Sequence, residues 1–284
     1  FTTVSAADVQ LAVLDEGAGP AVLLQHGFPD TPHTWDEVTE RLVAKGYRVI
    51  RPWGRGIAPS GIPSSGSYRL RDQARDIVSV LDGLQIDTAV VVGHDWGAAA
   101  AWGAGHLAPE RIDKLVAVAI PHPASFRLTL RQSWAARHFI ENRLPGAAWR
   151  FARNDFHHVR KLYERWSPGF DWPDCEFEPV KNAYAAPGSL NASLDYYRQF
   201  GRWPFRGKVA CNTLVIGGHT DGVLGEDDFR RSTRRVSGPC TVSMLPGGHF
   251  LHREHPEPFI GTLLAFLGDD AATDGSERRG MDSP

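Results

Sequence analysis

The sequence predicts an α/β fold in which a mainly parallel sheet carries helices on both faces. Short apolar runs alternate with helix-like segments through the first 120 residues, and the same rhythm resumes after residue 205. The run Ala89–Val92 is rich in β-branched residues and does not alternate with polar ones, as expected for a strand covered on both faces. Alternating strands and helices are typical of parallel sheets between layers of helices.

Seven of the apolar runs are predicted strands, and three other segments are predicted helices. The segment Trp35–Lys45 has apolar residues at helical spacing and stops at Gly46, a residue type common just past helix ends. The segment Arg69–Leu84 has one apolar face, and a final helix is expected near Pro258–Leu267. The predicted strands are Val9–Leu14, Ala21–Leu24, Tyr47–Ile50, Ala89–Val92, Leu115–Ile120, Thr213–Ile216 and Thr241–Leu245.

The stretch from residue 121 to about residue 205 breaks this rhythm. It has no strand-like run, is rich in aromatic residues, and is divided into short helices by prolines. We interpret it as a helical cap over a ligand site, because long insertions in compact domains are usually functional; an ordinary helical subdomain is the alternative. The predicted division is a core of residues 1–120 and 206–268, a cap of 121–205, and a disordered tail of 269–284.

Composition and charge limit the classes of function. The chain has 284 residues, of which 42% are hydrophobic, enough for a full core. Its 31 Lys and Arg residues against 33 Asp and Glu residues give a net charge of -2, so nothing favours nucleic acid or an anionic membrane as a partner. The three cysteines form no CxxC pair, and neither a secretory signal nor a run of roughly 20 apolar residues is visible. We expect a cytoplasmic protein, as a monomer or a homodimer.

The pattern Gly93-x-Asp95-x-Gly97 stands where a predicted strand leads into an alanine-rich segment. Small residues two positions either side of a central one permit a very tight strand-to-helix turn, which projects the central side chain out of the sheet edge. The N-terminus of the following helix favours an ionised carboxylate. Asp95 is therefore a candidate nucleophile, and a plain helix cap is the alternative.

Three further groups are expected at the same edge of the sheet. The loop that ends at Phe28 follows an early strand, and its backbone N–H, with that of Trp96, can form an oxyanion hole. Asp221 follows the sixth predicted strand, and His249 follows the seventh. Each of these residues alone could belong to a simple turn or loop. Together they lie at strand ends, where ligands bind to sheets of this kind.

These motifs resemble the α/β-hydrolase family, in its epoxide hydrolase and haloalkane dehalogenase branch. The resemblance extends from Val4 to Leu267 and rests on HGFPDTPHTW, GHDWGAAAAW, PERIDKLVAVAIPHP, SLDYYR and GGHF. The chain order nucleophile, acid, histidine is the order found in those enzymes. The resemblance implies an α/β-hydrolase fold with a helical cap, closest to the epoxide hydrolases, and a cis peptide bond between Phe28 and Pro29.

An aspartate nucleophile favours displacement at a saturated carbon. A carboxylate that attacked an acyl carbon would leave an unstable anhydride, whereas at a saturated carbon it displaces an alkoxide or halide and leaves an alkyl ester. Water activated by a His–Asp pair then attacks the carbonyl of that ester. We assign Asp95 as nucleophile, His249 as base and Asp221 as the group that orients it, with an oxyanion hole at Phe28 and Trp96. No metal or organic cofactor is required.

The leaving group is expected to be the oxygen of an apolar epoxide, held by donors from the cap, and the product a vicinal diol. Epoxide hydrolases of this branch commonly use two cap tyrosines. The motif Leu194–Arg198 matches theirs and implies one at Tyr197, and the position of the other is taken by His138, as in some members. Trp134 or Arg137 is the alternative to His138. The predicted substrate-binding residues are Trp96, Phe28, Pro29, Trp134 and Phe139.

Two alternatives stand beside this prediction. A haloalkane or haloacid dehalogenase would use the same aspartate, but Phe28 stands where many haloalkane dehalogenases have Asn. Fluoroacetate dehalogenases resemble the chain in the cap but have Arg just after the nucleophile, where this chain has Trp96 and alanines. A weakly catalytic ligand-binding protein on the same fold is the second alternative. The spacing of His249, His252 and His255 could suggest a metal, but no acid or Cys completes a set, so none is predicted.

Overall fold

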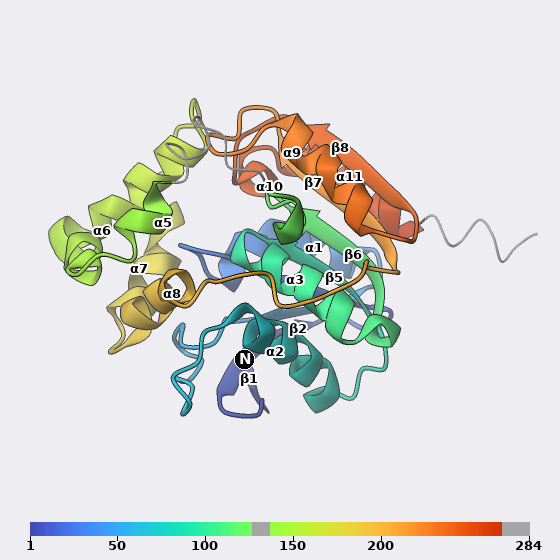
Figure 1. The fold of residues 1–284 in the computed structure, drawn as a ribbon, viewed down its shortest axis with the longest axis horizontal. Coiled ribbons are helices and arrows are strands. Elements are labelled where there is room, and N and C mark those ends of the chain that lie inside the picture. The colour runs from blue at the N-terminus through green and yellow to red at the C-terminus, as the bar shows by residue number, and fades with distance from the viewer. Residues whose placement is uncertain (127–136, 269–284) are drawn as a thin grey trace, which may run out of the picture.

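The computed structural model describes residues 1–126 and 137–268 and contains, within them, one sheet of eight strands (Figure 1). The strands are β1 Thr2–Ser5, β2 Gln10–Glu16, β3 Ala21–Gln25, β4 Arg48–Pro52, β5 Ala89–His94, β6 Ile112–Val118, β7 Asn212–Gly218 and β8 Cys240–Leu245. They lie in the order β1-β2-β4-β3-β5-β6-β7-β8. β1 and β2 pair antiparallel with their neighbours, and every pair from β4 to β8 is parallel. The mainly parallel sheet that the sequence predicts is therefore confirmed.

All seven predicted strands are present, but hydrogen-bond pairing rather than apolarity sets their ends. β6 begins at Ile112, and it ends at Val118 rather than at the predicted Ile120. Ala119 has a φ of 61°, which strand residues do not adopt, so the strand stops before it. β1 was not predicted, because Val4 is the one buried residue among its four and the apolar signal is correspondingly weak.

Helices cover both faces of the sheet, as predicted (Figure 1). Those of the core are α1 Asp36–Ala44, α2 Leu70–Gly83, α3 Trp96–Leu107, α9 Glu226–Arg230, α10 Leu251–Glu254 and α11 Pro256–Gly268. Successive side chains of a strand point to opposite faces. Leu23 of β3 belongs to the apolar cluster that contains Trp102 of α3. Its neighbour Val22 belongs to a second cluster, with Trp35 and with residues of α1 and α11. This burial on both faces explains why the central strands are continuous apolar runs in the sequence.

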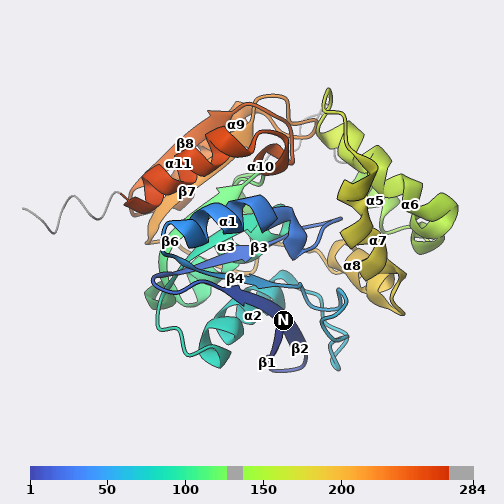
Figure 2. The ribbon, with the colours of Figure 1, turned by 180° about the vertical axis from the view of Figure 1, so that it is seen from behind.

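The predicted cap segment forms helices that gather to one side of the core (Figures 1 and 2). They are α5 His138–Glu141, α6 Ala147–Trp166, α7 Glu178–Ala185 and α8 Ser189–Arg198, and α6 is interrupted by non-helical residues at 153–156. A third apolar cluster joins them to the core, since Phe28 and Trp96 pack with Phe151, Tyr163 and Trp166. The arrangement supports the division into core and cap, which stays a prediction. The predicted tail, 269–284, lies outside the described residues.

The longest of these helices, α6, has 20 residues and carries charged side chains along its length. Within residues 1–126 and 137–268, no helix combines the length and the apolar character needed to cross a membrane. The three cysteines are free thiols, with Cys175 exposed and Cys211 and Cys240 partly buried. The cytoplasmic location and the choice between monomer and homodimer stay predictions from the sequence.

Candidate active site

Asp95 stands at the tight turn between β5 and α3. Its φ and ψ are 51° and -120°, a combination uncommon for residues other than glycine. A Cβ on Gly93 would lie 2.2 Å from the carbonyl oxygen of Gly97, and a Cβ on Gly97 would lie 2.2 Å from that of Gln25. The small-x-Asp-x-small pattern therefore has a steric cause. The helix begins at Trp96, so its N-terminus lies next to the carboxylate.

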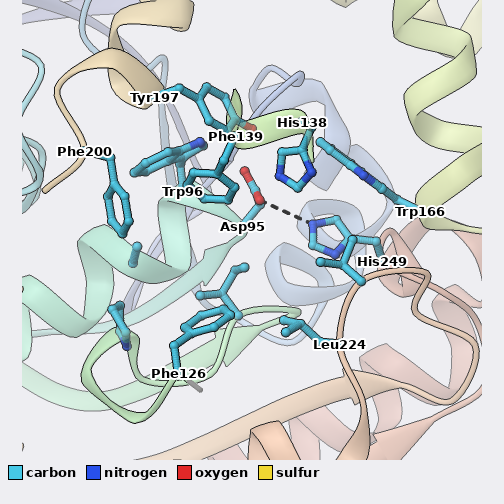
Figure 3. Close-up of a pocket in the computed structure, with 14 residues that line it drawn as sticks. Asp95, Trp96, Phe126, His138, Phe139, Trp166, Tyr197, Phe200, Leu224 and His249 are labelled. Atoms are coloured by element: carbon cyan, nitrogen blue, oxygen red, sulfur yellow. Dashed lines mark hydrogen bonds and ion pairs between the residues drawn. The ribbon is translucent and has the colours of Figure 1, made fainter. Parts of the chain in front are cut away.

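The two carboxylate oxygens of Asp95 have different surroundings. Oδ1 accepts a hydrogen bond of 2.8 Å from the backbone N–H of Phe28, in the loop after β3. Oδ2 lies 3.4 Å from Nε2 of His249 (Figure 3). The side chain as a whole is 11% exposed. One oxygen is thus held by a fixed donor, while the other lies beside the imidazole.

His249 and Asp221 form a buried pair beside Asp95. Nδ1 of His249 lies 2.9 Å from Oδ2 of Asp221. The other oxygen of Asp221 accepts hydrogen bonds from the backbone N–H groups of Val223 and Leu224, at 2.7 and 3.1 Å. Burial lowers the pKa of His249, but the charges of Asp221 and Asp95 and the hydrogen bonds to both raise it to about 10. The imidazole is therefore held in its protonated form while both carboxylates are ionised.

A cavity opens over Asp95, and apolar side chains form most of its wall (Figure 3). Among the described residues, its ionisable side chains are Asp95 and His249 from the core and His138 and Tyr197 from the cap segment. The other lining residues are Trp96, Ala99, Ile120, Pro123, Phe126, Phe139, Trp166, Phe200, Val223 and Leu224. A mostly apolar cavity with a few convergent polar groups is typical of small-molecule sites.

Tyr197 of α8 and His138 of α5 lie across the cavity from His249 and beside Asp95 (Figure 3). Their ring centroids are 5.8 Å apart, with the ring planes at 89°. Burial and the negative charge of Asp95 raise the pKa of Tyr197 well above its ordinary value, although hydrogen bonds to Trp96 and Asn142 act in the other direction. Tyr197 is therefore a neutral phenol that can donate its proton. The two cap residues singled out from the sequence meet at the same cavity.

Comparison with known proteins agrees with this arrangement. Residues 20–256 match the model of the alpha/beta hydrolase fold family. The chain belongs to the α/β-hydrolase family. A protein of Caballeronia sordidicola named epoxide hydrolase is 40% identical to it over 299 residues, which cover 91% of each chain. Epoxide hydrolase A of Mycobacterium tuberculosis is 28% identical over 304 residues, which cover 91% of this chain and 94% of its own.

A solved structure shows the same fold. The epoxide hydrolase of Bacillus megaterium, in complex with an inhibitor, superposes with a TM-score of 0.84. The match covers 94% of this chain and 100% of that one, at 23% sequence identity. At this identity the likeness concerns the fold alone. The predicted α/β-hydrolase fold and the predicted family are thereby confirmed, with epoxide hydrolases among the near relatives.

Two of the predicted substrate-binding residues of this α/β-hydrolase line the cavity. The rings of Trp96 and Phe139 each lie 5.1 Å, centroid to centroid, from the ring of Tyr197. Trp96 is also the first residue of α3, and the first N–H groups of a helix have no partner within the helix. Its backbone N–H is therefore suited to the predicted oxyanion hole. Trp134, the other cap aromatic predicted to contact the substrate, lies outside the described residues.

Phe28 and Pro29 contribute through their backbone rather than through side chains in the cavity wall. Neither is among the described residues that line the cavity. The ring of Phe28 packs 5.0 Å from that of Tyr197, while its N–H reaches Asp95. The carbonyl oxygen of Pro29 accepts a hydrogen bond of 3.0 Å from the hydroxyl of Tyr163. The peptide bond between Phe28 and Pro29 is cis, as the resemblance implies.

Trp166 is a site residue that sequence reasoning missed. Its ring lines the cavity and lies 5.3 Å from the ring of His249. Its carbonyl oxygen accepts hydrogen bonds of 3.0 Å from the N–H groups of both Gly222 and His249. These two hydrogen bonds connect the end of α6 to the loop that carries Asp221 and to the loop that carries His249. The one local signal is the Ser-Pro pair that follows Trp166 and ends the helix.

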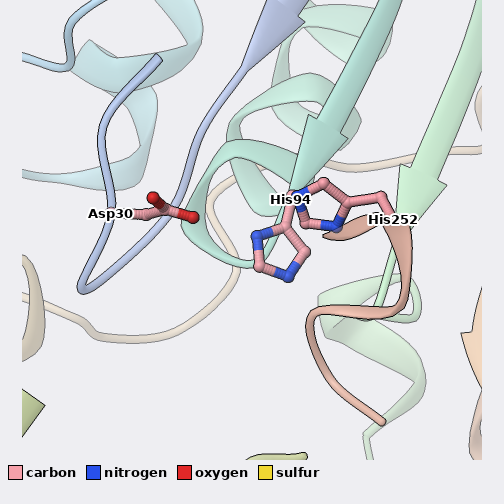
Figure 4. A group of neighbouring side chains, drawn as sticks. All are labelled: Asp30, His94 and His252. Atoms are coloured by element: carbon pink, nitrogen blue, oxygen red, sulfur yellow. The ribbon is translucent and has the colours of Figure 1, made fainter. Parts of the chain in front are cut away.

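The three histidines spaced at 249, 252 and 255 do not make a metal site. His249 is paired with Asp221, and His255 is exposed on the surface. Within the described residues, a different set places metal-ligating atoms near one another, namely Asp30, His94 and His252 (Figure 4). This set lies apart from the cavity, since none of its members lines it.

Proposed function

We propose that this α/β-hydrolase is an epoxide hydrolase, which converts an apolar epoxide to a vicinal diol through an alkyl ester on Asp95. The observation that carries the proposal is the unequal setting of the two Asp95 oxygens, one held by the N–H of Phe28 and one beside the imidazole of His249. Tyr197 and His138 line the same cavity. The relatives named epoxide hydrolases, above all that of Caballeronia sordidicola, support the same assignment.

In the first step, Oδ2 of Asp95 attacks one carbon of the epoxide ring, and the bond between that carbon and the ring oxygen breaks. Tyr197 donates its proton to the oxygen as negative charge develops there, and His138 stabilises the same charge by a hydrogen bond. The products of this step are a hydroxyalkyl ester of Asp95 and a tyrosinate. Among the described residues no Arg or Lys lines the cavity, so its mostly apolar wall favours epoxides over substrates that carry a carboxylate.

In the second step, His249 takes a proton from water, and the hydroxide attacks Cγ of the Asp95 ester. The carbonyl oxygen of that ester is Oδ1, which the N–H of Phe28 already holds and the N–H of Trp96 can reach. The tetrahedral intermediate then expels the diol oxygen, which takes the proton from His249. Between the two steps the protonated His249 gives its proton to the tyrosinate, which restores neutral Tyr197. The remaining water proton later passes from the regenerated carboxyl group back to His249, so water and epoxide together give the diol.

The ester itself switches His249 from acid to base. Before the first step, the Asp95 carboxylate is one of the causes that raise the pKa of His249 to about 10, and a protonated imidazole cannot accept a proton. Formation of the ester removes that negative charge and lowers the pKa toward that of an imidazole paired with Asp221 alone. His249 can therefore act as a base only when there is an ester to hydrolyse.

Trapping of the ester tests the proposal. The variant His249→Gln removes the base of the second step but leaves Asp95 in place, so it should accumulate the ester. After incubation with a styrene-type epoxide, intact mass spectrometry should show the protein plus the mass of the whole epoxide, located by peptide mapping at Asp95. The double variant His249→Gln with Asp95→Asn is the matched control and should show no adduct.

The same experiment distinguishes the two rival functions. A dehalogenase would transfer the alkyl group of a bromoalkane to Asp95 and would leave the epoxide untouched. A ligand-binding protein without chemistry would give no adduct with either compound. An adduct with the epoxide on a residue other than Asp95 would also contradict the proposed mechanism.

A further inference from the structure

A second set of chemically capable side chains lies behind the nucleophile elbow. Asp30 belongs to the loop after β3, His94 is the last residue of β5, and His252 lies on α10 (Figure 4). One potential ligand atom from each lies within 4.8 Å of the other two. All three side chains are buried, with 1%, 0% and 1% of their surfaces exposed. None of them has a part in the chemistry proposed above.

Each of the three residues has a buried polar atom without a hydrogen-bond partner among the described residues. These atoms are Oδ2 of Asp30, Nδ1 of His94 and Nδ1 of His252. Buried polar atoms in native proteins are nearly always satisfied by protein or by a bound species, since an unmet one costs free energy. The three unmet atoms belong to three adjacent side chains, so they are the polar groups that one ligand placed between them would satisfy.

The hydrogen bonds of the other ring nitrogens prepare the two imidazoles to bind a metal. Nε2 of His94 lies 2.9 Å from the backbone carbonyl oxygen of His249. A carbonyl oxygen can only accept a hydrogen bond, so Nε2 carries the proton and donates it, and the lone pair of the His94 ring is on Nδ1. Nε2 of His252 lies 2.7 Å from the hydroxyl of Thr34, within hydrogen-bond distance. Metal-ligating histidines usually have their second nitrogen held in this way.

The electrostatic setting also suits a cation. When its carboxyl group is ionised, Asp30 supplies a negative charge to the set. Arg253 lies 3.7 Å from Oδ1 of Asp30, but its guanidinium is also paired with Glu176. Oδ2 of Asp30 is left for a ligand.

A surface crevice gives access to the set without passing through the active-site cavity. Its lining includes Asp30, Thr34 and His252. The crevice and the active-site cavity share no lining residue among the described residues. Three further acidic residues line the same crevice, namely Asp36, Glu37 and Glu176. His33 and Arg253 line the crevice as well, and Asp36 and Glu176 are paired with Arg51 and Arg253. The acidic side chains still outnumber the basic ones, so the crevice can admit a divalent ion.

We propose that Asp30, His94 and His252 bind a late first-row divalent metal ion, such as Zn²⁺ or Co²⁺, as a structural tie. Two imidazoles and one carboxylate suit these ions, whereas Mg²⁺ and Ca²⁺ prefer oxygen ligands alone. A metal–nitrogen bond is about 2.0–2.1 Å long. Each of the three ligand atoms would therefore have to move by less than about 1 Å toward a common centre to bind one ion. The ion would join the loop that carries the Phe28 donor, the elbow that carries Asp95 and the helix after His249.

The test is a metal titration of the full chain, stripped of metal with a chelator and then dialysed free of it. Addition of CoCl₂ should produce visible absorption bands that saturate at one equivalent, and ZnCl₂ should abolish them. Zn²⁺ should also raise the temperature of thermal unfolding, because a ligand that binds only the folded state stabilises it. Neither readout depends on epoxide chemistry, so this proposal and the proposed function can fail separately.

Matched variants locate the ion. His252→Gln should weaken Co²⁺ binding by about 100-fold or more, because loss of a direct ligand costs at least as much as loss of an outer partner. His255→Gln, three residues away and exposed, should leave the binding unchanged. Should His252→Gln fail to fold, Asp30→Asn keeps the size of the side chain and serves the same purpose. Absence of binding by the unmodified protein, or binding that survives both His252→Gln and Asp30→Asn, would overturn the proposal.

Discussion

Replacement of Asp95 by Asn should lower the pKa of His249, and the structure gives the size of the effect. Nε2 of His249 and Oδ2 of Asp95 are 3.4 Å apart. Two unit charges at that separation interact by about 5 kcal/mol at an effective dielectric constant of about 20, which corresponds to roughly three and a half pKa units. Both charges are spread over several atoms, so we expect a fall of about 1–3 units from the value of about 10.

The assay is an NMR titration of the His249 ring nitrogens in ¹⁵N-labelled protein. Asp113→Asn removes an exposed acid of β6 and is the control that should leave the pKa in place. The same coupling affects the free energy of unfolding. Because the pKa of His249 in the folded protein lies above the ordinary 6.5, the stabilisation by protonated His249 is complete below about pH 6.5 and is lost as the pH rises toward 10. Asp95→Asn should therefore flatten the stability profile between those limits. An unchanged His249 pKa in Asp95→Asn would refute the reasoning.

Three further changes test separate parts of the account. Tyr197→Phe should slow epoxide opening by about 10²–10⁴-fold, while the rate of hydrolysis of a preformed ester should stay near that of the unmodified protein. Stopped-flow and quench measurements separate the two rates, and an unchanged rate of opening would exclude Tyr197 as the proton donor. Asp221→Asn should slow ester hydrolysis by a similar factor and make the adduct visible by mass, and a normal second step would argue against its orienting role. Gly97→Ala places a Cβ 2.2 Å from the carbonyl oxygen of Gln25 and should lower the unfolding temperature strongly, whereas Gly261→Ala, with open space around it, should not; equal unfolding temperatures would contradict the steric account of the elbow.

The sequence was enough to bring Asp95, Asp221 and His249 together because each follows a strand of a parallel sheet. The carboxyl ends of β5, β7 and β8 lie at one edge, so the order of strands and motifs along the chain predicts the meeting of the three side chains. The elbow was equally predictable, since the turn at Asp95 excludes side chains at Gly93 and Gly97. These are local constraints, and one sequence records them.

The cavity wall could not be predicted in the same way, because it depends on how the cap helices return to the core. Trp166 is fixed by hydrogen bonds from Gly222 and His249, which are more than 50 residues away along the chain. The ring of Phe28 was expected to contact the substrate. In the structure the backbone N–H of Phe28 donates to Asp95, and its ring packs in the apolar cluster that joins the cap to the core. The set of Asp30, His94 and His252 likewise arises from three distant segments.

The fate of a single oxygen atom tests the central claim most directly. One turnover of epoxide by excess enzyme in H₂¹⁸O should give a diol without ¹⁸O, because its new oxygen comes from Oδ2 of Asp95, and the peptide that contains Asp95 should gain one ¹⁸O. A diol that carries ¹⁸O after that first turnover, with no label in the peptide, would mean that water attacks the epoxide directly and would contradict the ester on Asp95.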